Sequence, residues 1–164
     1  MKKMKKVLFL TSVIMFSIVF VKAQNADPEL DYIKKAYSKD KKTIVDEYMG
    51  LDVQEGAKFW PVYAAYETNR EKLARERFKL IEEYVNNADK LTPVLADKLA
   101  TAVLTNNVNL DKLNLATYGK MKTAIGAIKA AKYMQLETYL QTTWRAVMQD
   151  VIPLIGELEK TQRN

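Results

Sequence analysis

The sequence contains no cysteine and no histidine among its 164 residues. Disulfide bonds are therefore excluded, as are metal sites built from thiolates or imidazoles and nucleophilic triads that need histidine as a base. The sequence also lacks a glycine-rich phosphate loop, a G-x-S-x-G motif and the D-x-D-x-D-G pattern of a calcium loop. Acid pairs such as Glu82-Glu83 are sequence neighbours and diverge on a helix. These absences predict a protein that is not an enzyme and holds no metal or cofactor.

The sequence has a single long apolar run, the fifteen residues 7–21, interrupted only by Thr11, Ser12 and Ser17. Four lysines precede it, and it ends at Val21-Lys22-Ala23, the small-residue pattern that a signal peptidase reads. A membrane-spanning helix needs about 20 apolar residues, so a cleavable export signal fits better than the alternative, a retained anchor. We expect cleavage after Ala23 and a periplasmic or secreted product.

The signal peptide distorts the overall charge. The whole chain has 26 basic and 20 acidic residues, a net charge of +6, but five of the basic residues and none of the acids lie in residues 1–23. Cleavage thus leaves a net charge of +1, which removes the case for nucleic-acid binding. We expect two parts: the signal peptide, 1–23, and a single all-helical domain, 24–164, with a polar tail from about residue 156 and no stable membrane insertion after cleavage.

The few glycines and prolines mark the ends of predicted helices. Asp27-Pro28, Asp52 and Thr92-Pro93 are start signals, whereas Gly50 and Gly126 are stop signals. They divide the chain into four helices, approximately 28–49, 52–86, 93–125 and 127–150, and no segment alternates like a strand. The first helix is polar at 38–42, where we expect fraying or a break; Gly119 or the Asn106-Asn107 pair could interrupt the third. The predicted fold class is all-α, a four-helix hairpin or bundle, curved by a kink at Pro61 in the second helix.

Two helix starts about forty residues apart resemble each other. The first is Leu51-Asp52-Val53-Gln54-Glu55, in which Glu55 completes a capping box, and the second is Leu91-Thr92-Pro93-Val94-Leu95. Both resemble degenerate copies of the LTxxQ motif of the Spy/CpxP-type periplasmic proteins, with Asp52 for Thr, and with Glu55 and Leu95 where Gln belongs. The segments Phe59-Trp60-Pro61-Val62-Tyr63-x-x-Tyr66 and 129–137 are similar to a divergent branch of that group. The likeness covers roughly residues 34–155.

The resemblance implies a curved helical hairpin, commonly an antiparallel dimer, whose concave face binds unfolded proteins without ATP. Other members of the family sense envelope stress or metal by docking on a membrane partner. Metal-sensing relatives use histidine and acidic ligands, and the lack of histidine here argues against that branch.

The aromatic segment of the second helix has two interpretations. Phe59, Tyr63 and Tyr66 recur at i, i+4 and i+7, which is the spacing of a packed core face. Alternatively, these rings and Trp60 line a surface that binds client proteins. The basic residues that follow, among them Arg70 and Arg77, either form a solvated face or steer acidic segments of a client toward that surface.

The predicted function is that of an exported, ATP-independent, chaperone-like or stress-related protein that binds non-native proteins on an apolar, partly basic, concave helical surface. Its candidate binding residues are Phe59, Trp60, Tyr63, Tyr66, Arg70 and Arg77. The alternatives are an envelope-stress sensor or adaptor that docks on a specific membrane partner, and a structural envelope protein without clients. Expected partners are unfolded or partly folded exported proteins, an envelope sensor protein, or a second copy in a homodimer.

Overall fold

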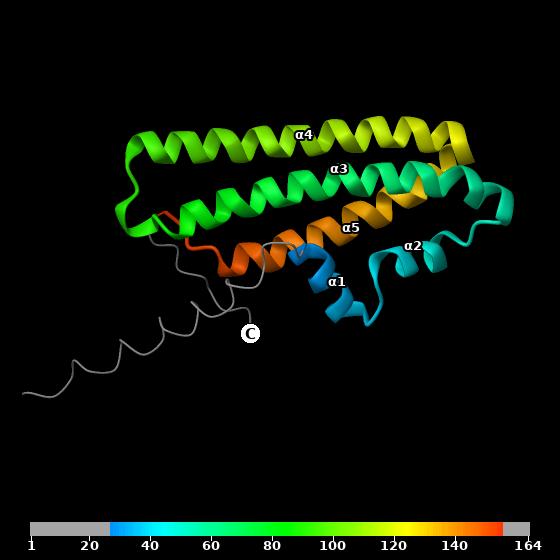
Figure 1. The fold of residues 1–164 in the computed structure, drawn as a ribbon, viewed down its shortest axis with the longest axis horizontal. Coiled ribbons are helices and arrows are strands. Elements are labelled where there is room, and N and C mark those ends of the chain that lie inside the picture. The colour runs from blue at the N-terminus through cyan, green and yellow to red at the C-terminus, as the bar shows by residue number, and fades with distance from the viewer. Residues whose placement is uncertain (1–26, 156–164) are drawn as a thin grey trace, which may run out of the picture.

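The structure is a computed structural model that describes residues 27–155, and this part of the chain is all-α (Figure 1). Its helices are α1 (Pro28–Tyr37), α2 (Lys41–Met49), α3 (Val53–Val85), α4 (Pro93–Ile125) and α5 (Ala127–Val151), with a 3₁₀ turn, η2 (Ala88–Lys90). The long helices α3, α4 and α5 lie side by side, with α4 antiparallel to the other two. The short helices α1 and α2 pack on α5.

The all-α class is confirmed, but the first predicted helix is two helices, so the described residues contain five α-helices rather than four. Helix α1 ends at Ser38, which adopts a left-handed conformation with φ of 56°. Asp40 then caps α2 by accepting a hydrogen bond from the Thr43 amide at 2.9 Å. The intervening segment offers no apolar side chain to a helix face, which is why a break here costs little.

Capping residues set the other helix ends where the sequence predicts them. The Asp52 side chain accepts from the Glu55 amide at 2.8 Å and Glu55 accepts from the Asp52 amide, a complete capping box. Thr92 accepts from the Leu95 amide at 3.2 Å. Gly50 and Gly126 have φ of 56° and 84°, values that a residue with a Cβ rarely adopts. The repeated helix-cap motif, Leu51 and Leu91 included, therefore stands at the starts of α3 and α4.

The predicted interruptions of the third helix are wrong, because α4 is continuous through Asn106, Asn107 and Gly119. Asn106 is buried, and its side-chain amide donates to the Leu73 carbonyl of α3 at 3.0 Å. This asparagine joins two helices and does not end one. Helix α3 is likewise unbroken at Pro61, and the kink there stays a prediction.

The core lies where α3 and α5 meet α1, α2 and the end of α4. Tyr133 of α5 is at its centre and makes edge-on ring contacts with Phe59, Tyr63 and Tyr66 of α3, with ring centroids 5.4 to 6.1 Å apart. The remaining buried apolar side chains of this cluster are Ile33, Val45, Met49, Met121, Ala130, Leu136 and Leu140.

Among residues 27–155, no helix is long and apolar enough to cross a membrane. The predicted signal peptide, its cleavage site after Ala23 and the polar tail from about residue 156 all lie outside the described residues.

Candidate functional site

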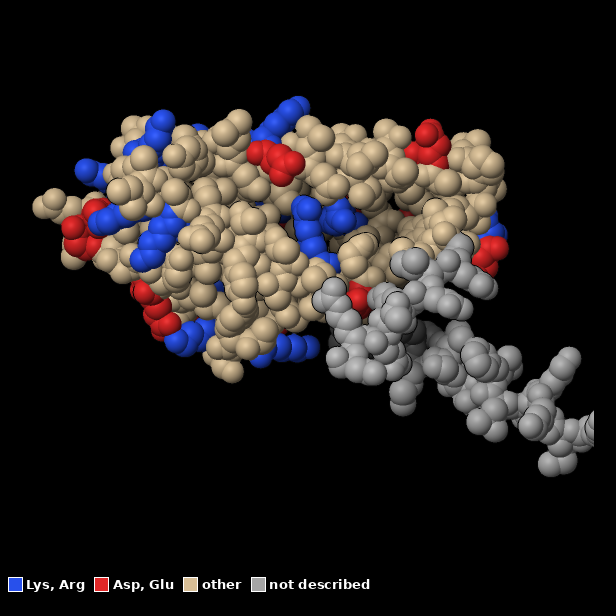
Figure 2. Space-filling view, turned by 180° about the vertical axis from the view of Figure 1, so that it is seen from behind, with Lys and Arg blue, Asp and Glu red and all other residues tan. Residues whose placement is uncertain are grey.

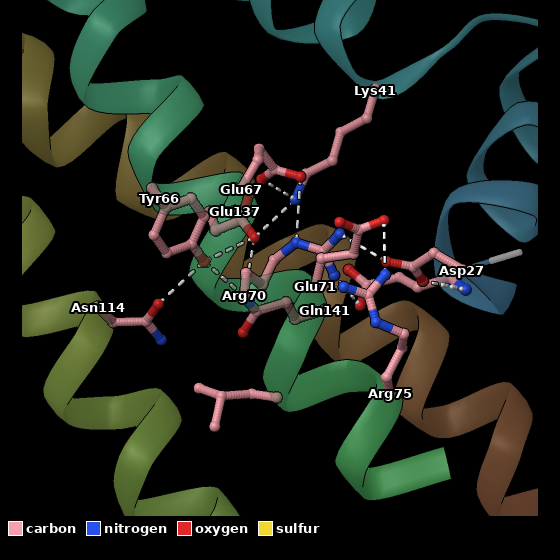
Figure 3. A network of polar contacts seen from close by, with 12 residues as sticks. Asp27, Lys41, Tyr66, Glu67, Arg70, Glu71, Arg75, Asn114, Glu137 and Gln141 are labelled. Carbon is pink, nitrogen blue, oxygen red and sulfur yellow. Dashed lines mark hydrogen bonds and ion pairs between the residues drawn. The ribbon is translucent and has the colours of Figure 1, made fainter. Parts of the chain in front are cut away.

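A buried ionic network joins α1, α2, α3 and α5 (Figure 3). Its first centre is Arg70 of α3, which is only 2% exposed. The guanidinium donates to Asp27 at 2.9 Å and to Glu29 at 2.8 Å, both at the start of α1. It also donates to Glu67 at 3.1 Å on its own helix. Arg70 thus fixes the beginning of α1 against α3.

The second centre is Glu137 of α5, which is fully buried. One oxygen, Oε1, accepts hydrogen bonds of 2.8 Å from the ammonium of Lys41, from the hydroxyl of Tyr66 and from the side-chain amide of Gln141. Lys41 also donates to Glu67 at 2.8 Å, so Glu67 connects the two centres. Asn114 brings α4 into the network through a 3.0 Å bond from the Tyr66 hydroxyl.

Burial and ion pairing compete in setting the pKa values of these groups. Burial alone would raise the pKa of Glu137, but the Lys41 charge and its hydrogen bonds hold that pKa below its usual value. Burial would lower the pKa of Lys41, yet Glu137 and Glu67 raise it. Burial raises the pKa of Glu29 despite the opposing charge of Arg70. Lys41 and Glu137 are therefore a charged pair at neutral pH.

This network lacks the features of a reactive site. Its side chains are enclosed by helices and bind mainly one another. The Oε1 atom of Glu29 and the Oε2 atom of Glu137 are buried and have no hydrogen-bond partner among residues 27–155. In the described part of the chain, no group of three or more acidic side chains is placed to hold a metal ion. The arrangement holds helices in register, as buried polar networks do when most of their members are satisfied.

Beside the network, between α1, α3, α4 and α5, lies a cavity of about 60 Å³. Asp27, Glu29, Arg70 and Gln141 line it where it borders the network. Its further walls come from the second half of α3 and the end of α5: Leu73, Ala74, Arg77, Phe78, Ile81, Trp144, Arg145, Met148, Gln149 and Ile152, with Asn106 and Leu110 from α4. Figure 2 shows basic side chains beside a hollow on this face of the molecule.

The outer face of α4 has a different character, because apolar side chains lie exposed along it. Val94 is 81% exposed, Leu104 64%, Val108 50% and Leu115 73%. They are spaced by ten, four and seven residues, so at 3.6 residues per turn they form one stripe along the helix. The exposed Thr101 lies on the same face, in the gap between Val94 and Leu104. We call the four apolar residues the α4 stripe.

The predicted binding residues lie mostly inside the protein. Phe59, Tyr63 and Tyr66 belong to the core, so the packing interpretation describes them and their assignment to an accessible surface is corrected. Arg70 is buried by its ion pairs, which corrects its assignment to a basic surface that steers clients. Trp60 is half-buried against Phe59 and Tyr63. Arg77 is half-buried at the cavity and stands apart from the aromatic cluster.

Sequence reasoning missed Lys41 and Glu137 as partners, and it missed the α4 stripe. The stripe was detectable in the sequence, because positions 94, 101, 108 and 115 form a seven-residue repeat on a second face of the helix that is apolar except at Thr101. The pair leaves no such signal, because the two residues are 96 positions apart in segments rich in charge.

Comparison with known proteins gives no match: no family model fits the chain, and neither a curated protein nor a solved structure is significantly similar to it.

Proposed function

We propose that this protein is an exported, ATP-independent binding protein for non-native polypeptides, and that the α4 stripe is its binding surface. The observation that carries the proposal is the row of exposed apolar side chains on α4. Several exposed apolar side chains along one helix face are a common mark of a site of interaction. The export signal and the resemblance to the Spy/CpxP-type proteins support the same role.

The stripe has the chemistry that a non-native segment needs. Covering an exposed Leu or Val contributes roughly 1.5–3 kcal/mol, so a few such contacts suffice for weak, reversible binding. Four exposed charged residues of both signs lie within or beside the stripe: Asp97, Lys98, Asp111 and Lys112. Charges of both signs suit clients of either net charge. The aromatic rings of α3 are not available to a client, because they are packed in the core.

The test compares stripe variants with a matched control. Residues 24–164 are added to an aggregating model protein without nucleotide, as wild type, as Leu104→Ser/Val108→Ser, and as Ile128→Ser, which replaces an apolar residue, 87% exposed, that starts α5 outside the stripe. We expect the wild type and Ile128→Ser to suppress aggregation and the double variant to lose most of the effect. Equal suppression by all three proteins would show that the α4 stripe is not the binding surface. No suppression by the wild type would contradict the proposed function.

A second candidate is supported by the seven-residue repeat along this face, which suits a helical partner better than an extended client. A second copy is one such partner. In an antiparallel pair of α4 helices centred between Leu104 and Thr105, Asp97 would lie level with Lys112 and Lys98 with Asp111. Self-association through this face is what a structural envelope protein would use, and a helix of a sensor protein is the other option.

Crosslinking separates these candidates. A client-binding protein should recover many exported proteins, a sensor or adaptor one dominant partner, and a structural protein mainly itself. Sedimentation of the wild type and of Leu104→Ser/Val108→Ser then shows whether a dimer forms through the α4 stripe.

A further inference from the structure

The cavity beside the ionic network has two different ends. Where it borders the network, the carboxylates of Asp27 and Glu29 are bound by Arg70. Arg77 lies seven residues further along α3, about 10 Å at the rise of an α-helix. Arg145 of α5 lines the same cavity, and its positive charge repels that of Arg77. The second end of the cavity is therefore basic.

The two arginines at this end are not neutralised within the described part of the chain. Arg77 donates a 2.8 Å hydrogen bond to the neutral Asn107, and neither Arg77 nor Arg145 forms an ion pair with a carboxylate of residues 27–155. Both side chains are half-buried. Burial, followed by the charge of Arg145, lowers the pKa of Arg77. Partly desolvated like charges without a counter-ion cost free energy, which an anion placed between them would relieve.

The remaining walls of this end are apolar and aromatic. Leu73, Ile81 and Met148 come from α3 and α5, and the rings of Phe78 and Trp144 stand with them. A volume of about 60 Å³ admits several waters or part of a hydrocarbon chain. A bare phosphate would gain nothing from such walls, whereas an apolar tail would be covered by them. Small-molecule sites commonly combine mostly apolar walls with a few convergent polar groups.

We propose that this cavity binds an amphipathic carboxylate, such as a medium-chain fatty acid, whose head group lies between Arg77 and Arg145 and whose chain enters the cavity past Trp144. Guanidinium groups bind carboxylates with charge-assisted, often bidentate hydrogen bonds. A cationic amphiphile is less well matched, because Arg70 already binds the carboxylates of Asp27 and Glu29 at the opposite end and only the Oε1 atom of Glu29 is left to accept a hydrogen bond there. The site is independent of the α4 stripe.

Calorimetric titration of residues 24–164 with octanoate tests the proposal, and octanol and octylamine serve as probes of equal chain length. We expect saturable binding of octanoate, and binding of octanol and octylamine that is weaker by at least about tenfold, the ratio that one charge-assisted hydrogen bond supplies. Trp144 fluorescence in a Trp60→Phe background should change along the same titration. Absence of octanoate binding would overturn the proposal, and equal binding of octanol would overturn the role of the arginines.

Variants locate the head group. Arg77→Gln and Arg145→Gln should each weaken octanoate binding on the order of tenfold. Arg75→Gln changes an exposed arginine of the same helix that is paired with Glu71 at 3.1 Å, and it should leave octanoate binding unchanged. Without ligand, Arg145→Gln should melt no lower than the wild type, because it removes a repulsion. Lower melting of Arg145→Gln, or equal loss of octanoate binding in Arg75→Gln, would contradict the site. Because the cavity and the α4 stripe are separate, these variants should suppress aggregation as well as the wild type does. The aggregation assay therefore tests the proposed chaperone role independently of octanoate binding.

Discussion

Two regions of the molecule reverse the usual distribution of polarity. One is the interface at which α1 and α2 pack on α3 and α5, and the other is the outer face of α4. The first encloses three buried carboxylates and the half-buried carboxylate of Glu67, together with an ammonium and a guanidinium. The second exposes four large aliphatic side chains to solvent. Charged residues are rarely fully buried unless they are paired, whereas contiguous exposed apolar side chains on a monomer usually mark an interaction site. The ionic interface therefore serves the fold, and the α4 stripe is the surface on which the proposed binding function rests.

The comparison predicts opposite responses to mutation. Changes in the network should alter the free energy of unfolding and affect binding only through it. Changes in the stripe should alter binding and leave stability almost untouched.

The largest effect is expected for Arg70→Met, because it leaves Asp27, Glu29 and Glu67 without their shared cation. Breaking a buried ion pair from one side typically costs about 3–5 kcal/mol. Urea unfolding monitored by circular dichroism measures the loss. The control is Arg75→Met, whose exposed pair with Glu71 should contribute no more than about 1 kcal/mol. Equal losses in the two variants would show that the network does not hold the fold.

Alkaline pH should destabilise the protein nearly as strongly. Burial raises the pKa of Tyr63, Tyr66 and Tyr133 above the ordinary value of 10.0, and acidic partners raise that of Lys41 above 10.5. A raised folded-state pKa stabilises the protein below the unfolded-state pKa, and this contribution is lost as pH rises toward the folded-state pKa. Each tyrosine should therefore cost about 1 kcal/mol between pH 10 and pH 11.

Unfolding curves at several alkaline pH values, together with tyrosinate absorbance, test this prediction. The three tyrosines should ionise only as the protein unfolds. Ionisation near pH 10 in the folded state would contradict their burial.

A smaller effect is expected for Tyr66→Phe. The substitution keeps the ring in the core but removes the hydroxyl, whose single proton lies within hydrogen-bond distance of Glu137 and Asn114 and whose oxygen accepts from Gln141. Losing a buried hydrogen-bonding group of this kind costs about 1–3 kcal/mol. The matched control is Tyr63→Phe on the same helix and the same aromatic cluster, for which no hydrogen bond of the hydroxyl is found within residues 27–155. Chemical denaturation should rank Tyr66→Phe as clearly less stable than Tyr63→Phe.

The smallest effect on stability belongs to the α4 stripe. Leu104→Ser/Val108→Ser should change the free energy of unfolding by no more than roughly 0.5–1 kcal/mol, because both side chains are half or more exposed. The same protein should lose most of its aggregation suppression. A large drop in the thermal midpoint would mean that these side chains support the fold, and the separation between the two regions would fail.

The helix ends were predictable from sequence because capping is a local effect. Asp52, Thr92 and Gly126 each act within a few residues of their own position, so their patterns read the same in the sequence and in the fold. The split at Ser38 was indicated for the same reason, by a short polar stretch. The continuity of α4 was not predictable, because the role of Asn106 depends on the Leu73 carbonyl of another helix, 33 residues earlier in the sequence.

The candidate site was harder to predict because long-range pairing decides it. Arg70 stands among arginines and lysines that are all more exposed than it is, and only the arrival of Asp27 and Glu29 from α1 distinguishes it. The aromatic spacing of α3 correctly indicates a helix face, but spacing alone does not say whether that face meets a neighbouring helix or a partner. Burial of Phe59 and Tyr66 answers this in favour of the core.

The connection between Lys41 and Glu137 joins two segments that are far apart in the sequence. Helices α1 and α2 come first in the chain, but their buried partners in α5 lie about a hundred residues later. However the chain is delivered, α2 has no carboxylate in α5 to bind until residue 137 has emerged, and contacts of such long range form slowly. The α3–α4 hairpin can assemble from neighbouring segments, and α1 and α2 can already pair with Arg70 and Glu67 of α3. The contact of Lys41 with Glu137 is added only when α5 joins them.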